Sequence, residues 1–233
     1  MLALIGAMDQ EVSGLLARMS ATEVNTRGSL VVHRGTLGGR NLLLARSGVG
    51  RQAAERACGT ILDQYPVTAI VSFGYCGALN PRLAVGDVVT CSRVFSLEGR
   101  SYQEPRCDAA LLALMRAANR ASSSLGNGVT YSRLVASVED KRALFESCGA
   151  DVVDMESYWV GAIAAENGIP FASVRVVSDS ASDSLPELPT WRWRHVLPHF
   201  AIHPARGVTL YRGLRKASKN ITDFLSSVVE AAA

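Results

Sequence analysis

Residues 170–179 read PFASVRVVSD, an apolar and β-branched run that predicts a buried strand ending at Asp179. A similar run, LALIG, occupies residues 2–6, and Glu11 follows it within one short segment. Glu156 follows a third, shorter apolar run. In open α/β sheets, ligands bind at the carboxyl ends of such strands. We therefore expect these three carboxyl groups to converge on one crevice.

The rest of the chain alternates strand-like and helix-like patterns, which is typical of an α/β fold with right-handed crossovers. Strands are expected at residues 2–6, 30–37, 41–46, 69–73, 87–95, 129–137 and 170–178, and helices at residues 8–19, 52–64, 107–122, 138–146 and 155–166. The predicted hairpin at residues 30–46 adds antiparallel pairing. We predict a three-layer α/β sandwich with a central mixed, largely parallel twisted sheet.

Composition narrows the class of protein. The 233 residues are 48% hydrophobic and 19% charged, which favours a single globular domain over residues 1–233. Five cysteines without paired spacing argue against a disulfide framework and against a zinc site, and favour a reducing compartment. We find no signal-peptide pattern and no apolar run of the ~18 residues that a membrane span needs. A cytoplasmic protein without metal or cofactor is expected.

Charge does not by itself indicate nucleic-acid binding, because the net charge is only +3, and we expect no nucleic-acid partner. Carboxyl groups that converge without a Cys/His cluster indicate acid/base chemistry on a neutral substrate or one that develops positive charge. Cleavage of a glycosidic bond fits, because its transition state has oxocarbenium character. Simpler interpretations stay open: Glu11 suits the first turn of a helix, and Asp154 and Asp179 suit helix caps.

Two further features of the sequence, an arginine within an apolar strand and two glycine-rich segments, bear on the candidate site. Arg175 lies inside an apolar strand, where an unpaired guanidinium group would be costly, so a buried carboxylate partner is expected. Two glycine-rich segments, residues 47–50 (SGVG) and 74–77 (GYCG), end or follow strands. Such turns can present backbone N–H groups to a phosphate, a water molecule or a ribose. They are equally ordinary turns, and neither matches a known phosphate-binding or dinucleotide-binding motif.

Together these pieces resemble the nucleoside phosphorylase/nucleosidase superfamily, and within it the 5′-methylthioadenosine/S-adenosylhomocysteine nucleosidases. No single motif is specific, but several occur in the family's order. The matching segments are residues 5–12, 47–50, 74–79, 85–89, 154–157 and 174–179. The resemblance implies a nucleoside phosphorylase-like fold, a purine nucleoside substrate and a homodimer.

The resemblance also implies roles for individual residues. Glu11 would activate the attacking water, and Asp179 would protonate N7 of the purine, for which burial must raise its pKa. Other positions would bind or orient the substrate. These candidate substrate-binding residues are Met155 beneath the sugar, Glu156 on the ribose hydroxyls, Arg175 and Ser178 beside the acids, and Gly74, Tyr75 and Val138.

The chain departs from the family's usual pattern in three places. Tyr75 stands where the nucleosidases usually have a small hydroxyl residue, which changes the nucleophile pocket. The purine-stacking aromatic expected at residues 137–139 is absent. Residues 135–144 and 154–157 look more like the hopanoid-associated nucleosidases, which remove adenine from an adenosylated polycyclic lipid. The sequence therefore leaves the 5′ substituent of the substrate open.

Two other functions compete with hydrolysis. A phosphorylase must bind a phosphate dianion, and Arg46, Ser47 and Gly48 are the candidates for that pocket, or for the pocket of a water nucleophile. Asp9 and Glu11 disfavour phosphate by roughly 1 kcal/mol or more each at close range. A non-catalytic nucleoside-binding protein would be expected to lack at least one of the three acids, and this chain has all of them.

The C-terminal part, at about residues 188–230, is basic and amphipathic. Residues 188–222 contain seven Lys/Arg and no Asp or Glu, with aromatic residues between them. An apolar helical stripe runs through Leu210, Tyr211, Leu214, Ala217, Ile221, Phe224, Leu225 and Val228. The simpler interpretation is a final helix docked on the sheet with a solvated basic face. The sharper hypothesis places residues 191–219 against an anionic membrane at the inner face, where each basic residue contributes ~1 kcal/mol.

Overall fold

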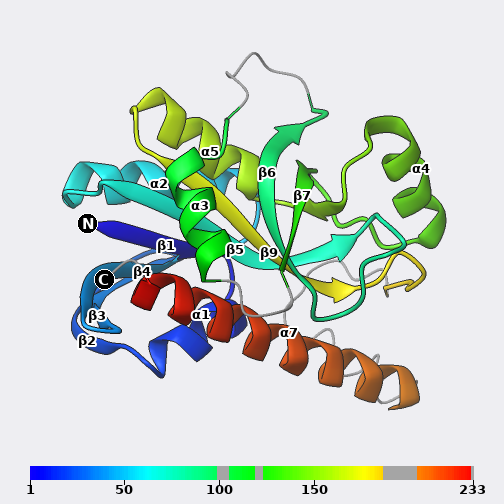
Figure 1. The fold of residues 1–233 in the computed structure, drawn as a ribbon, viewed down its shortest axis with the longest axis horizontal. Coiled ribbons are helices and arrows are strands. Elements are labelled where there is room, and N and C mark those ends of the chain that lie inside the picture. Colours follow the sequence, from blue (N-terminus) through cyan, green and yellow to red (C-terminus); the bar gives the residue numbers. More distant parts are fainter. Residues whose placement is uncertain (99–104, 119–122, 186–203, 232–233) are drawn as a thin grey trace.

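The computed structural model describes residues 1–98, 105–118, 123–185 and 204–231, with the backbone alone for residues 204–210. A strongly twisted sheet runs through this part of the chain, with helices on both sides (Figure 1). The strands are β1 (Leu2–Gly6), β2 (Ser20–Arg27), β3 (Leu30–Leu37), β4 (Arg40–Arg46), β5 (Ala69–Ala78), β6 (Val88–Ser96), β7 (Ser123–Thr130), β8 (Val152–Asp154) and β9 (Phe171–Asp179). The helices are α1 (Asp9–Leu16), α2 (Arg51–Gln64), α3 (Ala109–Ala117), α4 (Val138–Cys148), α5 (Ser157–Glu166) and α7 (Pro204–Ala231).

The sheet is mixed, in the order β2-β3-β4-β1-β5-β8-β7-β6-β9. Because β9 also pairs with β5, the strands β5, β9, β6, β7 and β8 close into a ring. Parallel pairs join β1 to β4 and β5, β5 to β9, and β7 to β6 and β8. Gly77 of β5 pairs with Val153 on one side and Asp179 on the other, so the ring brings the ends of three strands together.

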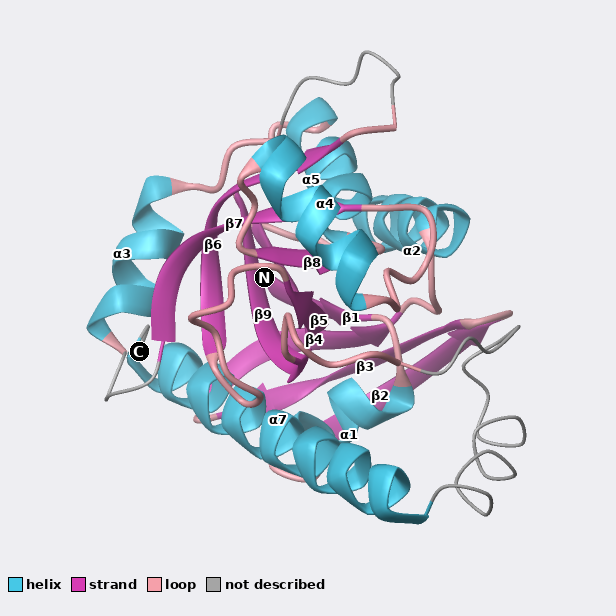
Figure 2. Cartoon of the chain, turned by 90° about the vertical axis from the view of Figure 1, so that its right-hand side faces the viewer, coloured by secondary structure: helices cyan, strands magenta, loops and turns pink. Residues whose placement is uncertain are grey.

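Helices lie on opposite sides of the sheet (Figure 2), and each side has its own apolar core. On one side, α2 and α5 bury residues such as Ile61 and Trp159. On the other side, α1, α3 and α7 bury Leu15, Met115 and Leu225. The predicted three-layer α/β architecture with a mixed central sheet is therefore confirmed.

Some element boundaries differ from the prediction. β2 was not predicted, because its side chains are almost all exposed and leave no apolar alternation. β5 continues through residues 74–77, which the sequence suggested as a turn. β7 ends at Thr130, so the strand predicted at residues 129–137 was largely wrong, and Ser137 instead caps α4. The end of the predicted helix at 107–122 lies outside the described residues.

The last helix docks on the sheet, as the simpler interpretation expects. Ala217, Ile221 and Leu225 of α7 are buried, whereas Arg212 and Arg215 are exposed. The aromatic and basic residues at 191–203 lie outside the described residues. Within the described chain, no helix combines the length and the apolar character that crossing a membrane requires.

Candidate active site

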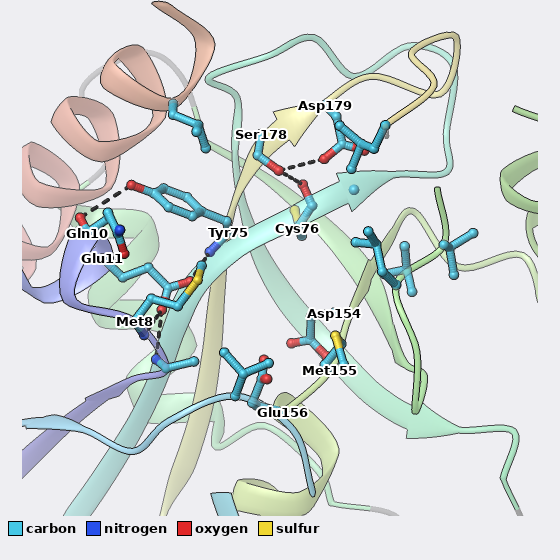
Figure 3. Close-up of a pocket in the computed structure, with 18 of the residues that line it drawn as sticks. Met8, Gln10, Glu11, Tyr75, Cys76, Asp154, Met155, Glu156, Ser178 and Asp179 are labelled. Carbon is cyan, nitrogen blue, oxygen red and sulfur yellow. Dashed lines mark hydrogen bonds between the residues drawn. The ribbon is translucent and has the colours of Figure 1, made fainter. Parts of the chain in front are cut away.

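A cleft opens at the carboxyl ends of β1, β5, β8 and β9, and it encloses about 1190 Å³ including its open mouth. Glu11, Glu156 and Asp179 all line it, which confirms that the three acids meet in one crevice. Figure 3 shows Glu11 and Tyr75 at one end of the cleft, Ser178 and Asp179 at another, and Glu156 below them.

Glu11 is held almost entirely by backbone N–H groups. It lies in the first turn of α1 and is 3% exposed. Its Oε2 accepts from the backbone N–H of Ala7 (2.7 Å) and of Met8 (2.8 Å), and its Oε1 from that of Tyr75 (2.8 Å). Oε1 therefore keeps a lone pair for one further donor, such as a water molecule. The capping role and a catalytic role are compatible in this geometry.

The protonation of Glu11 reflects competing effects. Burial raises the pKa of Glu11 above its usual value, although the three backbone N–H groups and Arg175 act in the opposite direction. Burial and the nearby Glu11 raise the pKa of Tyr75 to about 12, so this phenol stays neutral. The Tyr75 hydroxyl donates to the backbone carbonyl of Gln10 (3.3 Å). Tyr75 thus occupies space beside Glu11 without adding a charge.

Gly74 is required by close approach rather than by a turn. A Cβ at this position would overlap Oε1 of Glu11 and lie 3.0 Å from Nη1 of Arg175. Gly74 does not line the cleft, so its role is to let β5 pass directly behind the Glu11 carboxylate.

Asp179 is held by side chains instead. It is 4% exposed, its Oδ1 is 2.6 Å from the Ser178 hydroxyl, and its Oδ2 accepts from Nζ of Lys141 at 2.5 Å. Burial is the largest influence and raises the pKa of Asp179, while Lys141 and Ser178 act to lower it, with a net rise. The direction agrees with the expectation for a carboxyl group that must donate a proton.

Lys141 was missed by sequence reasoning. It is completely buried and belongs to α4. A signal was available, because Lys141 shares a helical face with Leu144 and Phe145, which pack in the small core beside β8. A lysine on the apolar face of a helix predicts a buried partner.

Met155 and Glu156 connect β8 to α5 and both line the cleft. Oε1 of Glu156 accepts from the backbone N–H of Gly50 (2.6 Å), a residue with φ of 87° that a side chain would strain. The first glycine-rich segment therefore presents an N–H group to a carboxyl group. Burial raises the pKa of Glu156 to about 8, and the neighbouring Asp154 contributes in the same direction.

Arg175 has the buried carboxylate partner that its sequence context predicts. Its Nε lies 2.5 Å from Oδ2 of Asp154, and its guanidinium group also donates to the hydroxyl groups of Ser157 and Ser72. Burial acts to lower the pKa of Arg175, but the charges of Asp154, Glu11 and Glu156 raise it overall. Arg175 lies behind the cleft rather than in its lining.

Asp154 is not the N-cap of α5, which is Glu156, but its side chain makes the expected contact with the first turn of that helix. It accepts from the backbone N–H of Ser157 (3.2 Å) and from the Thr130 hydroxyl (2.6 Å). The buried Asp154–Arg175 pair therefore joins β7, β8, β9 and α5 beneath the acids.

Several candidate residues lie elsewhere. Arg46 pairs with Asp9 at 2.8 Å. Ser47 is buried, with its hydroxyl 2.8 Å from the Gly48 carbonyl oxygen. Neither of them nor Gly48 lines the cleft. Val138 is the first residue of α4 and is likewise not among the residues that line the cleft.

The cleft has apolar lining that sequence reasoning did not identify. These residues come mainly from loops and from α7, where strand patterns give no signal. The additional lining residues include Val49, Leu134, Val135, Leu185, Tyr211 and Leu214, together with the cation Arg133. Among the residues that the structure describes, no cluster of His, Cys, Asp and Glu is arranged to hold a metal ion.

Residues 1–206 match the Phosphorylase superfamily. The chain belongs to this superfamily. It is 29% identical over 201 residues to the 5′-methylthioadenosine/S-adenosylhomocysteine nucleosidase of Shewanella oneidensis, covering 78% of this chain and 85% of that protein.

Solved structures share the fold. The 5′-methylthioadenosine/S-adenosylhomocysteine nucleosidase of Neisseria meningitidis, in complex with methylthio-immucillin-A, matches with a TM-score of 0.81 and 23% identity over 98% of both chains. The futalosine hydrolase of Helicobacter pylori matches with a TM-score of 0.80 and 19% identity, over 98% of this chain and 97% of that one. These structures show the shared fold. The predicted enzyme class, an N-glycosidic bond hydrolase, is supported by the superfamily match and by the Shewanella oneidensis relative.

Proposed function

We propose that this protein is a nucleosidase that hydrolyses the N-glycosidic bond of a 5′-substituted adenosine and releases adenine. The observation that carries this proposal is the convergence of Glu11 and Asp179 on one cleft, each buried and each with a raised pKa. Glycoside hydrolysis needs both a base and an acid around the scissile bond. The named activities of the relatives agree with this chemistry.

In the proposed mechanism, each of the three acids has a separate role. Glu11, through the free lone pair of Oε1, accepts a proton from the attacking water. Asp179 gives a proton to N7 of the purine, so that adenine leaves as a neutral base. Glu156 accepts from the ribose hydroxyls, and its carboxyl oxygens, with their partial negative charge, face the sugar on which positive charge develops.

Water is the proposed nucleophile because the described cleft offers little for a phosphate. Arg46 is paired with Asp9, and Arg175 is paired with Asp154 behind the lining. Arg133 is the one cation among the described lining residues, and its side chain is 64% exposed. Glu11, which must be ionised to act as the base, would repel a phosphate dianion at this site.

Product analysis tests this proposal. Purified protein is incubated with 5′-methylthioadenosine, with and without inorganic phosphate, and the products are separated by chromatography. We expect free adenine at equal rates in both reactions, together with the free sugar. A strict requirement for phosphate, with a ribose 1-phosphate product, would establish the phosphorylase alternative. Nucleoside binding without turnover would establish the non-catalytic alternative.

The 5′ substituent is proposed to be apolar and large, as in an adenosylated polycyclic lipid. Apolar side chains of α7 support this, because Leu214 lines the cleft and so does Tyr211, which is 51% exposed. The exposed Arg212 and Arg215 follow on the same helix. We propose that this part of α7 contacts the anionic inner face of the membrane, from which a lipid-borne nucleoside would enter.

Co-sedimentation with anionic vesicles tests the membrane contact. Wild-type protein should bind at low salt, and Arg212→Glu with Arg215→Glu should bind more weakly. The matched control is the exposed Arg82→Glu with Arg142→Glu, which should bind like wild type. Absence of binding, with brisk turnover of soluble methylthioadenosine, would favour the conventional small substrate.

A homodimer is also proposed, as the family resemblance implies. The cleft is open at its mouth, where Val49 is 51% exposed, and a second copy could cover this apolar side chain. Sedimentation velocity at micromolar concentration should give a dimer, and a monomer would contradict this proposal.

A further inference from the structure

Lys141 is a completely buried cation attached to the Asp179 carboxyl group. Its Nζ donates to Oδ2 of Asp179 at 2.5 Å, and to the backbone carbonyl oxygens of Ser180 and Asp183, both at 2.8 Å. An ammonium group has three N–H donors, and all three have acceptors here. The geometry is that of a charged lysine with every donor satisfied.

Burial of Lys141 is specific to this position on α4. The charged neighbours Glu139, Asp140 and Arg142 are exposed, as is usual for a helix surface. Removing a cation from water is costly unless it is paired and hydrogen-bonded. The buried cation Lys141 contacts Asp179, one of the acids of the proposed reaction, and does not lie in a remote part of the core.

The contacts of Lys141 also fasten the turn that follows β9. The Asp183 carboxyl group accepts from the backbone N–H of Ser180 (2.8 Å), which closes the turn on itself. The backbone N–H of Leu185 donates to the carbonyl oxygen of Ala136, just before α4 (2.9 Å). Lys141 thus links α4 to both Asp179 and the backbone that determines where Asp179 points.

We propose that Lys141 is a positioning residue for the reaction, fixing the Asp179 carboxyl group and setting its readiness to donate a proton. This rests on the proposed nucleosidase function, in which Asp179 protonates the leaving purine. Lys141 itself does not touch the substrate cleft.

The charges around Asp179 define the direction of the effect. Burial raises the pKa of Asp179 most strongly, Lys141 and Ser178 lower it, and Asp183 raises it. Cys76 also faces this group from β5, but burial keeps the pKa of its thiol well above the usual value, so it carries no charge near neutral pH. Lys141 is therefore the positive charge that opposes burial.

The Ser178 hydroxyl can serve both protonation states of Asp179. Its oxygen lies 2.6 Å from Oδ1 of Asp179 and 3.0 Å from the carbonyl oxygen of Cys76. When Asp179 is ionised, Ser178 donates to Oδ1. When Oδ1 carries a proton, it donates a hydrogen bond to the Ser178 hydroxyl, which then donates to the carbonyl oxygen of Cys76 instead. With Oδ2 held by Lys141, Oδ1 is the oxygen on which the transferable proton would reside.

The test compares the pH dependence of kcat/KM for methylthioadenosine in Lys141→Met and in the matched control Arg142→Met. Arg142 is the next residue on α4, but its side chain is 75% exposed. Loss of the buried cation should raise the pKa of Asp179, so the alkaline limb should move to higher pH in Lys141→Met and stay in place in Arg142→Met. Lost orientation should lower kcat at the optimum by roughly 10- to 100-fold.

A second variant and a second readout keep the result decisive. Lys141→Gln is used if Lys141→Met does not fold, because it retains N–H donors for the two carbonyl oxygens. The alkaline limb of its pH profile should move in the same direction. Carbon-13 NMR of the carboxyl groups, with Asp179→Asn for assignment, should show Asp179 titrating at higher pH in either variant. An unmoved alkaline limb in a folded Lys141 variant, or an unmoved Asp179 titration, would overturn the proposal.

If the proposed nucleosidase function is wrong, the experiments give a different result from the one that overturns the Lys141 proposal. In that case wild-type protein releases no adenine from the nucleoside, and no pH profile can be measured. The NMR titration then decides alone whether Lys141 sets the protonation of Asp179.

Discussion

The two ends of the cleft hold their acids by different means. Glu11 is fixed by three backbone N–H groups from β5 and from the start of α1, which are neutral donors that the fold itself positions. Asp179 is fixed by the side chains of Lys141 and Ser178, one of which carries a full charge. Both carboxyl groups are buried with raised pKa values. The same burial is therefore balanced by backbone dipoles at one end and by the buried side chain of Lys141 at the other.

The difference suits the two proposed roles. A base that activates water must be ionised when the substrate arrives, and backbone N–H donors stabilise only the carboxylate form. An acid must hold a proton and then release it, which requires partners that accommodate both forms. Ser178 can do so because a hydroxyl group both donates and accepts. Glu11 and Asp179 are both carboxylic acids, and their different hydrogen-bond partners assign them the two roles.

The largest effect should come from removing either acid. Asp179→Asn and Glu11→Gln should each lower kcat by about two to four orders of magnitude, the usual contribution of general acid/base groups. Substrate affinity should change little, because both groups act mainly in the transition state. Steady-state kinetics with a binding measurement on each variant checks this. Near-wild-type turnover in one variant would remove that residue from the mechanism.

A smaller effect should follow from disturbing the Glu11 end alone. Gly74→Ala places a methyl group against Oε1 of Glu11, so the carboxylate must shift. A displacement of this kind costs about 100-fold in kcat. Gly59→Ala is the control, because that glycine lies in α2 with open space around its Cβ position. Gly59→Ala should keep full activity, and equal activity in Gly74→Ala would show that the Glu11 geometry is not critical.

The smallest effect concerns Glu156, whose pKa burial raises from 4.5 to about 8. A folded-state pKa above the unfolded value adds stability that is complete at low pH and is lost as the pH rises through about 8. The melting temperature of the unliganded protein should therefore fall between pH 5 and pH 8 by the equivalent of ~1 kcal/mol, allowing for partial solvent exposure.

Glu156→Gln should flatten this part of the stability profile, and the exposed Glu139→Gln should leave it unchanged. Differential scanning fluorimetry across the pH range makes the comparison. A profile that is the same in wild type and Glu156→Gln would mean that Glu156 titrates near its ordinary value.

The sequence predicted the Glu11 end more completely than the Asp179 end. Glu11 and its helix follow directly from an apolar strand and a tight turn, which are local patterns. The fold class was predictable for the same reason, since buried strands such as residues 170–178 are strongly apolar. β2 and β7 were missed or displaced because one is exposed and the other is rich in Ser, Gly and Asn, so that neighbouring strands rather than local preference form them.

The partner of Asp179 could not be found locally. Lys141 is 38 residues away in sequence, on a helix whose other charges are exposed. Its contact with Asp179 depends on closure of the β5–β9–β6–β7–β8 ring, which no local pattern records. The apolar lining from α7 is a long-range feature of the same kind, because Leu214 reaches the cleft only after the helix has docked.

The most direct test of the division of labour is a change of leaving group. Wild type, Asp179→Asn and Glu11→Gln are compared on methylthioadenosine and on a riboside with the same 5′ substituent and a p-nitrophenyl leaving group, which departs without protonation. The account predicts that Asp179→Asn loses activity on the nucleoside but keeps most of it on the p-nitrophenyl riboside, whereas Glu11→Gln loses activity on both. Equal losses of Asp179→Asn on the two substrates would contradict the assignment of Asp179 as the leaving-group acid.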